Sequence, residues 1–276
     1  PNTFTVVRAL RDSLDIPVLC DDQQGTAVLV LAALVNALGL VEKKLETTRI
    51  VVMGAGAAGV ATADLLLKAG ARNLICLNSS GILNEANPRM DHIQTELALR
   101  TNPEGLKGGA AEALEGADVF IGLSRSRALE AEQVRRMAPR SVVFSLALPE
   151  PEISYEAAVA AGAEVVATGA GESHNSMPNL HAFPGIMRGA LDVRARALTD
   201  SMLLAAAYAL AGVVDKRQLS PMHIIPDPFC DEVAPRVAEA VAQKAIEEGL
   251  AAQPLPVGQV YNDTWQRLYG SNMARI

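Results

Sequence analysis

Two adjacent carboxylates, Asp21 and Asp22, lie in the segment IPVLCDDQQGTA, between an apolar run and a long apolar helix pattern. Acids directly before a helix are favoured by its dipole, so one explanation is a helix cap with a solvated neighbour. The other explanation is a divalent metal ion, because hard cations prefer carboxylate oxygen as a ligand. Two adjacent acids make an incomplete coordination shell, so their spacing leaves both explanations open.

Three glycines in the segment VVMGAGAAGVATADLLLKAG have the spacing G-x-G-x-x-G. The pattern follows a predicted strand and opens a predicted helix, which is the context that a dinucleotide-binding loop requires. The first glycine allows a tight turn, the second lets the backbone approach a pyrophosphate, and the third lets the helix pack on the strand. The phosphates would lie at the N-terminus of the helix. We therefore predict that NAD or NADP binds to the loop Gly54, Ala55, Gly56, Ala57, Ala58 and Gly59.

The second predicted strand ends in CLNSSG, at the place where NAD enzymes usually carry an acid for the ribose hydroxyls. Asn78 stands there instead. Its amide can hydrogen-bond a ribose hydroxyl without repelling a 2′-phosphate, to which Ser79 and Ser80 can donate. NADP therefore ranks beside NAD as the expected cofactor. The alternative is that Asn78 only begins a turn.

Apolar segments of strand length alternate with helix-like stretches, which indicates a parallel sheet covered on both faces. We predict an α/β fold: a Rossmann-like, doubly wound, mostly parallel sheet with additional C-terminal helices. A helix that is apolar around nearly its whole circumference begins at Thr26, a candidate N-cap, and is expected to be buried. The predicted strands are residues 49–53, 73–77, 118–123, 141–147 and 164–168, and the C-terminal helices are residues 183–197, 199–214, 229–249 and 263–274.

Charge and cysteine usage limit the classes of function. The 276 residues include 24 basic and 31 acidic ones, a formal net charge of −7, which disfavours nucleic acid or an anionic membrane as a partner. Three widely spaced cysteines are typical of reduced thiols in the cytoplasm. The longest apolar runs, at 27–38 and 201–214, are too short to span a bilayer. Because the chain begins with Pro1, we expect a processed chain or part of a longer one.

The sequence resembles the malic enzyme family, whose members oxidatively decarboxylate malate to pyruvate and CO2. The resemblance covers most of the chain, from Ile16 to Gly249, with its segments in family order. The matching segments are IPVLCDDQQGTA, VVMGAGAAGVATADLLLKAGA, ADVFIGLS, NLHAFPGIMRGALDVRA and IIPDPF.

The resemblance implies roles for individual residues. It implies that Asp22 is a ligand of Mg²⁺ or Mn²⁺ with Asp21 as its supporting neighbour, and that Asn179 contacts substrate and nicotinamide. It places Gly122 and Ser124 at the edge of the cofactor.

The resemblance also implies that part of the active site comes from elsewhere. The family's catalytic lysine and tyrosine and a Glu-Asp ligand pair precede the region shown here, so an upstream domain or partner chain would complete the site. We expect residues 1–25 to lead from that domain, residues 26–250 to bind NAD(P), and residues 251–276 to form a C-terminal helical extension. A homo-oligomer such as a homodimer is implied as well.

Several residues depart from the family pattern. Leu148 and Pro178 replace asparagines, and a loop that is usually SAPG reads SRSR, with Arg125 and Arg127. Arg125 is a candidate ligand for a substrate carboxylate or a phosphate, and the alternative is an exposed basic loop. These departures leave a related 2-hydroxy acid open as the substrate. They also leave open a catalytically altered homologue that acts as a binding or assembly module, and a Rossmann-type dehydrogenase without metal.

Overall fold

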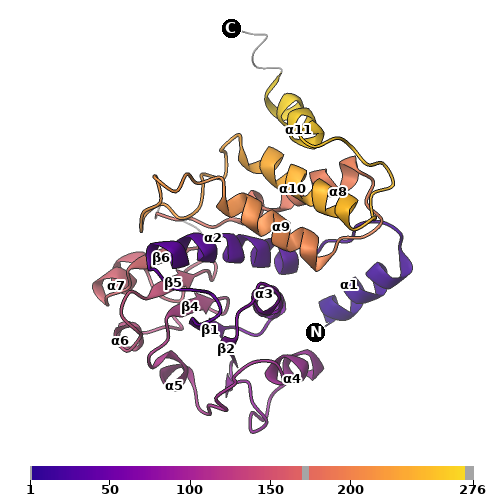
Figure 1. Cartoon of the computed structure of the whole chain (residues 1–276). Helices are drawn as coiled ribbons and strands as arrows, with labels where there is room; N and C mark the ends of the chain where they lie inside the picture. The colour runs from indigo at the N-terminus through magenta and orange to yellow at the C-terminus, as the bar shows by residue number, and fades with distance from the viewer. Residues whose placement is uncertain (1, 170–173, 271–276) are drawn as a thin grey trace.

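The computed structural model describes residues 2–169 and 174–270, built around a central six-stranded sheet (Figure 1). The strand order β3-β2-β1-β4-β5-β6 is that of a doubly wound dinucleotide-binding fold. All neighbouring strands run parallel except β3, which pairs antiparallel with β2. The predicted fold class is therefore confirmed. The strands are β1 (Arg49–Met53), β2 (Asn73–Asn78), β3 (Gly81–Ile82), β4 (Val119–Gly122), β5 (Val142–Ser145) and β6 (Val165–Thr168).

The side chains on the two faces of the sheet belong to two separate hydrophobic cores. Along β1, Ile50 and Val52 belong to one core, whereas Val51 and Met53 belong to the other. Because both faces are covered, the parallel strands are buried along nearly their whole length. The first core is covered by α2 (Thr26–Leu40) and α3 (Ala57–Lys68), and the second by α5 (Ala110–Leu114), α6 (Ala131–Arg135) and α7 (Tyr155–Ala160).

The C-terminal helices form a further layer over α2, so that α2 lies between this layer and the sheet (Figure 1). The last helix is held onto the layer by Glu239, whose carboxylate accepts hydrogen bonds from the Gly258 and Tyr261 N–H groups at 2.6 and 3.0 Å. Val260 of the same helix is fully buried. The helices are α8 (Phe183–Asp192), α9 (Asp200–Ala211), α10 (Val233–Glu247) and α11 (Gln259–Tyr269); α1 (Asn2–Ser13) and α4 (His92–Ala98) flank the sheet elsewhere.

Helix α2 begins at Thr26 as predicted, but Thr26 is not its N-cap, because its own backbone angles are helical. A π-helical turn, η1 (Asp21–Gly25), precedes α2, and Gly25 has helical backbone angles, so the two elements are continuous. The Gln24 side chain accepts a hydrogen bond from the Cys20 N–H group at 2.7 Å and closes the first turn. The continuous helical segment therefore begins at Asp21, six residues before Ala27, its first apolar residue.

Three C-terminal helices, α8, α9 and α10, are shorter than predicted. Helix α8 ends at Asp192, because Arg194 takes a left-handed conformation, with φ of 51°, and the chain reverses. Helix α10 begins only at Val233, after a turn in which the Asp227 carboxylate accepts a hydrogen bond from the Phe229 N–H group. The last predicted helix begins earlier, at Gln259, and the end predicted for it at residue 274 lies outside the described residues.

The apolar run 27–38 lies within a longer continuous helix, because η1 directly precedes α2. The continuous helix Asp21–Leu40 has 20 residues and, by length and composition only, is long and apolar enough to cross a membrane. In the structure, 72% of its most apolar window is buried inside the domain. The core helix of a globular domain has the same length and composition.

Burial gives the three thiols different reactivities. Cys76 lies inside β2, and its burial raises the pKa of its thiol to about 12, whereas Cys20 and Cys230 are partly exposed. At pH 8 we expect a thiol reagent to label Cys20 and Cys230 of the native protein and to spare Cys76, as read by peptide mass spectrometry. All three should react in denaturant, and rapid native labelling of Cys76 would contradict the buried position.

Candidate functional site

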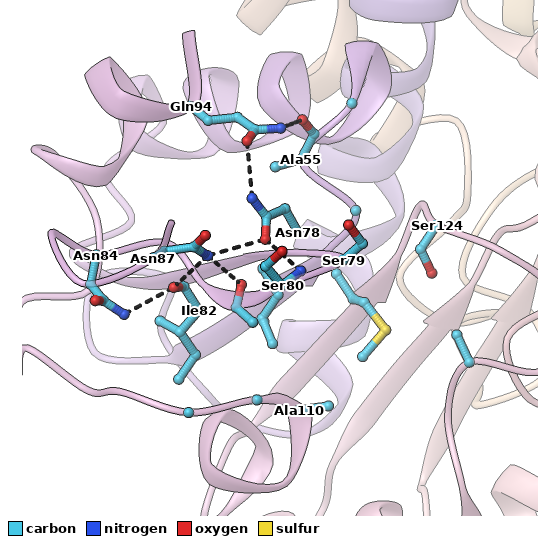
Figure 2. A pocket seen from close by; sticks show the side chains of 18 of the residues that line it. Ala55, Asn78, Ser79, Ser80, Ile82, Asn84, Asn87, Gln94, Ala110 and Ser124 are labelled. Carbon is cyan, nitrogen blue, oxygen red and sulfur yellow. Dashed lines mark hydrogen bonds between the residues drawn. The ribbon is translucent and has the colours of Figure 1, made fainter. Parts of the chain in front are cut away.

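A cavity of about 900 Å³ opens at the carboxyl ends of β1, β2 and β4 (Figure 2). Its walls include Met53, Leu77 and Asn78 at the ends of β1 and β2, and continue into the loops that follow β1, β2 and β4. In doubly wound folds ligands bind in this crevice, where the crossovers leave β1 in opposite directions. The position of the cavity is therefore that of a cofactor site.

The glycine loop forms one wall of the cavity, and each glycine meets a different constraint. Gly54 has φ of +112°, and a Cβ there would lie 2.2 Å from the Leu123 carbonyl oxygen. A Cβ at Gly59 would lie 1.7 Å from the Gly54 carbonyl oxygen, so α3 packs directly on the turn. A Cβ at Gly56 would meet no atom within 4 Å, and this residue lines the cavity. The loop is therefore closed on its protein side and open on its cavity side.

Asn78 stands at the end of β2, and its amide is fully used within the protein (Figure 2). Its Nδ2 donates to the Arg89 carbonyl oxygen at 2.8 Å and to Gln94 Oε1 at 3.0 Å. Its Oδ1 accepts from the Ser80 N–H group at 2.8 Å and from Asn87 Nδ2 at 3.1 Å. These four bonds occupy both N–H groups and both lone pairs. The amide thus shapes the turn and has no free donor for a ribose.

Groups with unused hydrogen-bonding capacity lie beside Asn78. Ser79 and Ser80 line the cavity, and their hydroxyls make no hydrogen bond with another described residue. Lys107 lines the cavity as well and forms no ion pair within the described part of the chain. The cavity therefore offers two hydroxyls after β2 and one ammonium group to a ligand.

The charge of the cavity is opposite in sign to that of the chain. Lys107 and Arg125 line it, and no Asp or Glu does so among the described residues, although the net charge of the chain is −7. The N-terminus of α3, with its positive dipole end, lies at the glycine loop on the same wall. The site is therefore suited to an anionic ligand.

The two arginines of the SRSR loop differ in their surroundings. Arg125 lines the cavity and makes no hydrogen bond or ion pair with another described residue. Arg127, with φ of 57°, pairs with the Glu150 carboxylate at 2.8 Å. Only Arg125 is therefore available to a ligand in the cavity.

Not all of the predicted cofactor residues line the cavity. Gly54, Ala55, Gly56, Asn78, Ser79 and Ser124 do so. The others are absent from the lining: Ala57, Ala58 and Gly59 form the start of α3, and Gly122 is buried at the end of β4.

Asp21 and Asp22 lie apart from this lining, on η1, which packs against α3. The Asp21 side chain folds over its own turn, so that a Cβ at Gly25 would be 2.0 Å from Asp21 Oδ1. The Asp22 side chain is exposed. No group of three or more His, Cys, Asp and Glu side chains able to hold a metal ion occurs among the described residues. This region therefore offers an incomplete shell, with Asp22 as its accessible carboxylate.

The remaining predicted substrate residues lie after β5 and β6. Asn179 begins the 3₁₀ turn η2 (Asn179–His181), and its side chain lies outside the described residues. Leu148, which replaces a family asparagine, is 65% exposed, and Pro178 is half-buried.

The sequence analysis missed several residues that build the site. Gln94 of α4 donates to the Ala55 carbonyl oxygen at 2.9 Å and so ties the glycine loop to the Asn78 turn. Asn87, Lys107 and Glu152 were also missed, the last being a fully buried acid behind Ser124. A visible signal was the run of asparagines in CLNSSGILNEANP, a composition typical of turns held by side-chain bonds.

Comparison with known proteins places this geometry in one family. The family model described as "Malic enzyme, NAD binding domain" matches residues 23–246. An NAD-dependent malic enzyme of Geobacillus stearothermophilus is 44% identical over 94% of this chain and 54% of its own length. An NADP-dependent malic enzyme of Halomonas elongata is 38% identical over 93% of this chain and 64% of its own.

A solved structure agrees with these relatives. The crystal structure of malic enzyme from Pyrococcus horikoshii Ot3 superposes with a TM-score of 0.92 at 41% identity, covering 100% of this chain and 66% of that one. The chain thus spans 54–66% of the length of these three relatives.

The packing of Gly59 on Gly54 makes the first helical glycine of α3 intolerant of a side chain. We expect Gly59→Ala to lower the free energy of unfolding by about 1–3 kcal/mol or more, because a backbone oxygen must move. The matched control is Gly39→Ala, at an exposed helical site with no atom within 4 Å, which should stabilise the protein by up to about 1 kcal/mol. Urea denaturation measures both, and equal stabilities would contradict the close packing.

Proposed function

Because the chain belongs to the malic enzyme family, we propose that it forms the dinucleotide-binding part of an enzyme that oxidatively decarboxylates malate or a related 2-hydroxy acid. NAD or NADP would be the hydride acceptor. The observation that carries the proposal is the cationic cavity without a lining acid, placed on an open glycine loop at the carboxyl ends of the strands. Pyruvate and CO2 would be the products from malate.

The residues of this chain bind and orient the cofactor. Gly56 leaves space for the pyrophosphate at the N-terminus of α3, where backbone N–H groups and the helix dipole favour negative charge. Ser79 and Ser80 face the ribose end, and Ser124 lies on the opposite wall of the cavity (Figure 2). Arg125 would bind a phosphate or the substrate carboxylate, and Asn179 would contact substrate and nicotinamide.

The metal site would be shared with groups outside this sequence. Asp22 is exposed and able to give one carboxylate to Mg²⁺ or Mn²⁺, while Asp21 supports the turn that presents it. When bound, the ion would act as a Lewis acid on the substrate oxygens. A base, an acid and the other ligands would come from an upstream domain or a partner chain.

We further propose a cytoplasmic homo-oligomer, a homodimer being the simplest form. The support is the family, together with three free cysteines in the described part of the chain, which are typical of a reducing compartment. From the family we also propose that residues 1–25 lead from an upstream domain, residues 26–250 bind NAD(P), and residues 251–276 form a C-terminal helical extension.

The activity is tested in the complete protein with Mn²⁺, malate and each cofactor. We expect NAD(P)H formation, and Asp22→Asn should lower kcat/KM about 100-fold or more, since the substituted amide no longer binds the cation as a charged ligand. The matched control is Asp15→Asn, at an exposed acid that precedes η1 in the chain. This variant should have the kcat/KM of the unsubstituted protein. A complete protein that forms no NAD(P)H with malate or related 2-hydroxy acids would overturn the enzyme in favour of a binding or assembly module. Full activity of Asp22→Asn would instead favour a metal-free dehydrogenase.

The cavity also makes a prediction about NADP. An ammonium group without an ion-pair partner is suited to a 2′-phosphate, so Lys107→Ala should raise KM for NADP about tenfold and change KM for NAD less than about twofold. Lys216→Ala removes an exposed lysine far from the lining and serves as the control. Equal effects of Lys107→Ala on both cofactors would show that this lysine does not recognise the 2′-phosphate.

A further inference from the structure

Glu152 is a completely buried acid that receives four hydrogen bonds. Its Oε1 accepts from the Ser124 N–H group at 2.8 Å and from Ser124 Oγ at 3.1 Å. Its Oε2 accepts from the Ala147 N–H group at 3.0 Å and from Ser145 Oγ at 3.1 Å. The carboxylate therefore joins the loop after β4 to the end of β5.

Two backbone N–H groups and two hydroxyls surround the Glu152 carboxyl group, so that each of its oxygens faces one obligatory donor. Among the described residues, no Lys, Arg or His forms an ion pair with it, so hydrogen bonds alone compensate the buried charge. The two oxygens of a carboxylate offer about four acceptor sites, and all four are occupied. A glutamine of the same shape would turn an NH2 group toward one of these pairs of donors, leaving buried donors unsatisfied.

The surrounding chain is built to admit this carboxylate. A Cβ at Gly122 would lie 2.5 Å from the Glu152 carboxyl carbon, so the end of β4 must be glycine. The backbone reinforces the same junction, because the Leu129 N–H group donates to the Glu152 carbonyl oxygen at 3.1 Å and the Arg127 N–H group to that of Pro151 at 3.0 Å. The segment after β5 thus holds the loop at Ser124, Arg127 and Leu129.

This loop is the wall of the cofactor cavity opposite the Asn78 turn. Leu123, Ser124, Arg125 and Ala128 line the cavity, whereas Glu152 does not. A ligand that touches Ser124 therefore meets a group whose backbone and hydroxyl are both fixed from behind by one carboxylate. Because the backbone of Ser124 is fixed, the position of the next residue, Arg125, is restricted as well.

We propose that Glu152 is a positioning residue for the dinucleotide: it fixes Ser124 and Arg125 in the geometry that binds the cofactor, without touching the cofactor itself. The proposal rests on the proposed function, because it assumes that the cavity holds NAD(P). In this proposal Glu152 increases the affinity for the cofactor, in addition to any contribution that it makes to folding.

The test uses the complete protein with Glu152→Gln and the matched control Glu150→Gln. Glu150 is exposed, lies two residues away and pairs with Arg127 of the same loop. We expect Glu152→Gln to raise the Kd for NADH and NADPH, read by fluorescence titration, about tenfold or more. The KM for the cofactor should rise in parallel, while kcat stays within about threefold. Glu150→Gln should stay within about twofold in every constant.

The same measurements contain the results that overturn the proposal. If Glu152→Gln lowers only the melting temperature, and the folded protein binds NADH and NADPH as before, the role of Glu152 is structural. If Glu152→Gln does not fold, Ser145→Ala replaces it, since this change removes one donor on the side away from the cavity. It should weaken cofactor binding about threefold, and unchanged binding would overturn the proposal.

The binding assay also separates this proposal from the proposed function. A complete protein that binds NADH but does not oxidise malate contradicts the function, while the variant series still decides the role of Glu152. A protein that binds neither NADH nor NADPH overturns both.

Discussion

The contact of α3 with the Gly54 carbonyl oxygen sets the geometry on which the cofactor cavity depends. Because no Cβ fits between Gly59 and this oxygen, the helix begins directly on the turn that ends β1. The turn also lies against Leu123, directly after β4, where Gly54 has a positive φ and leaves no space for a Cβ. One backbone contact thus brings a helix N-terminus, a strand end and the loop of the neighbouring strand to a single point.

The wall of the cavity is neutral or cationic, although the chain as a whole is acidic. The turn after β2 carries amide side chains and no lining acid. The Asn78 amide uses all of its donors and acceptors in hydrogen bonds within the protein. Glu152, an acid behind the opposite wall, accepts four hydrogen bonds, two of them from Ser124, and does not line the cavity. Asn78 and Glu152 therefore hold loops in place without presenting a negative charge to a polyanionic ligand.

The second layer of helices has a different task from the sheet. Helix α2 is buried between the sheet and α9, and its first turn, η1, carries Asp22 exposed at the surface. Since η1 packs against α3, the carboxylate and the glycine loop are held by neighbouring helices although they do not share one cavity. This arrangement agrees with a site completed by groups beyond this sequence.

The sequence by itself determined the sheet and the glycine loop, because both depend on local patterns: continuous apolar strands, alternating helices and glycines where backbones touch. It also determined the family, through motifs in a fixed order. Tertiary structure decided the rest. Strand β3 is too short for a pattern, and ordinary capping rules do not predict the π-helical turn η1 that precedes α2. The saturation of Asn78 and the burial of Glu152 arise from partners distant in the chain, and hydrogen bonds between such partners leave no periodic trace in a sequence.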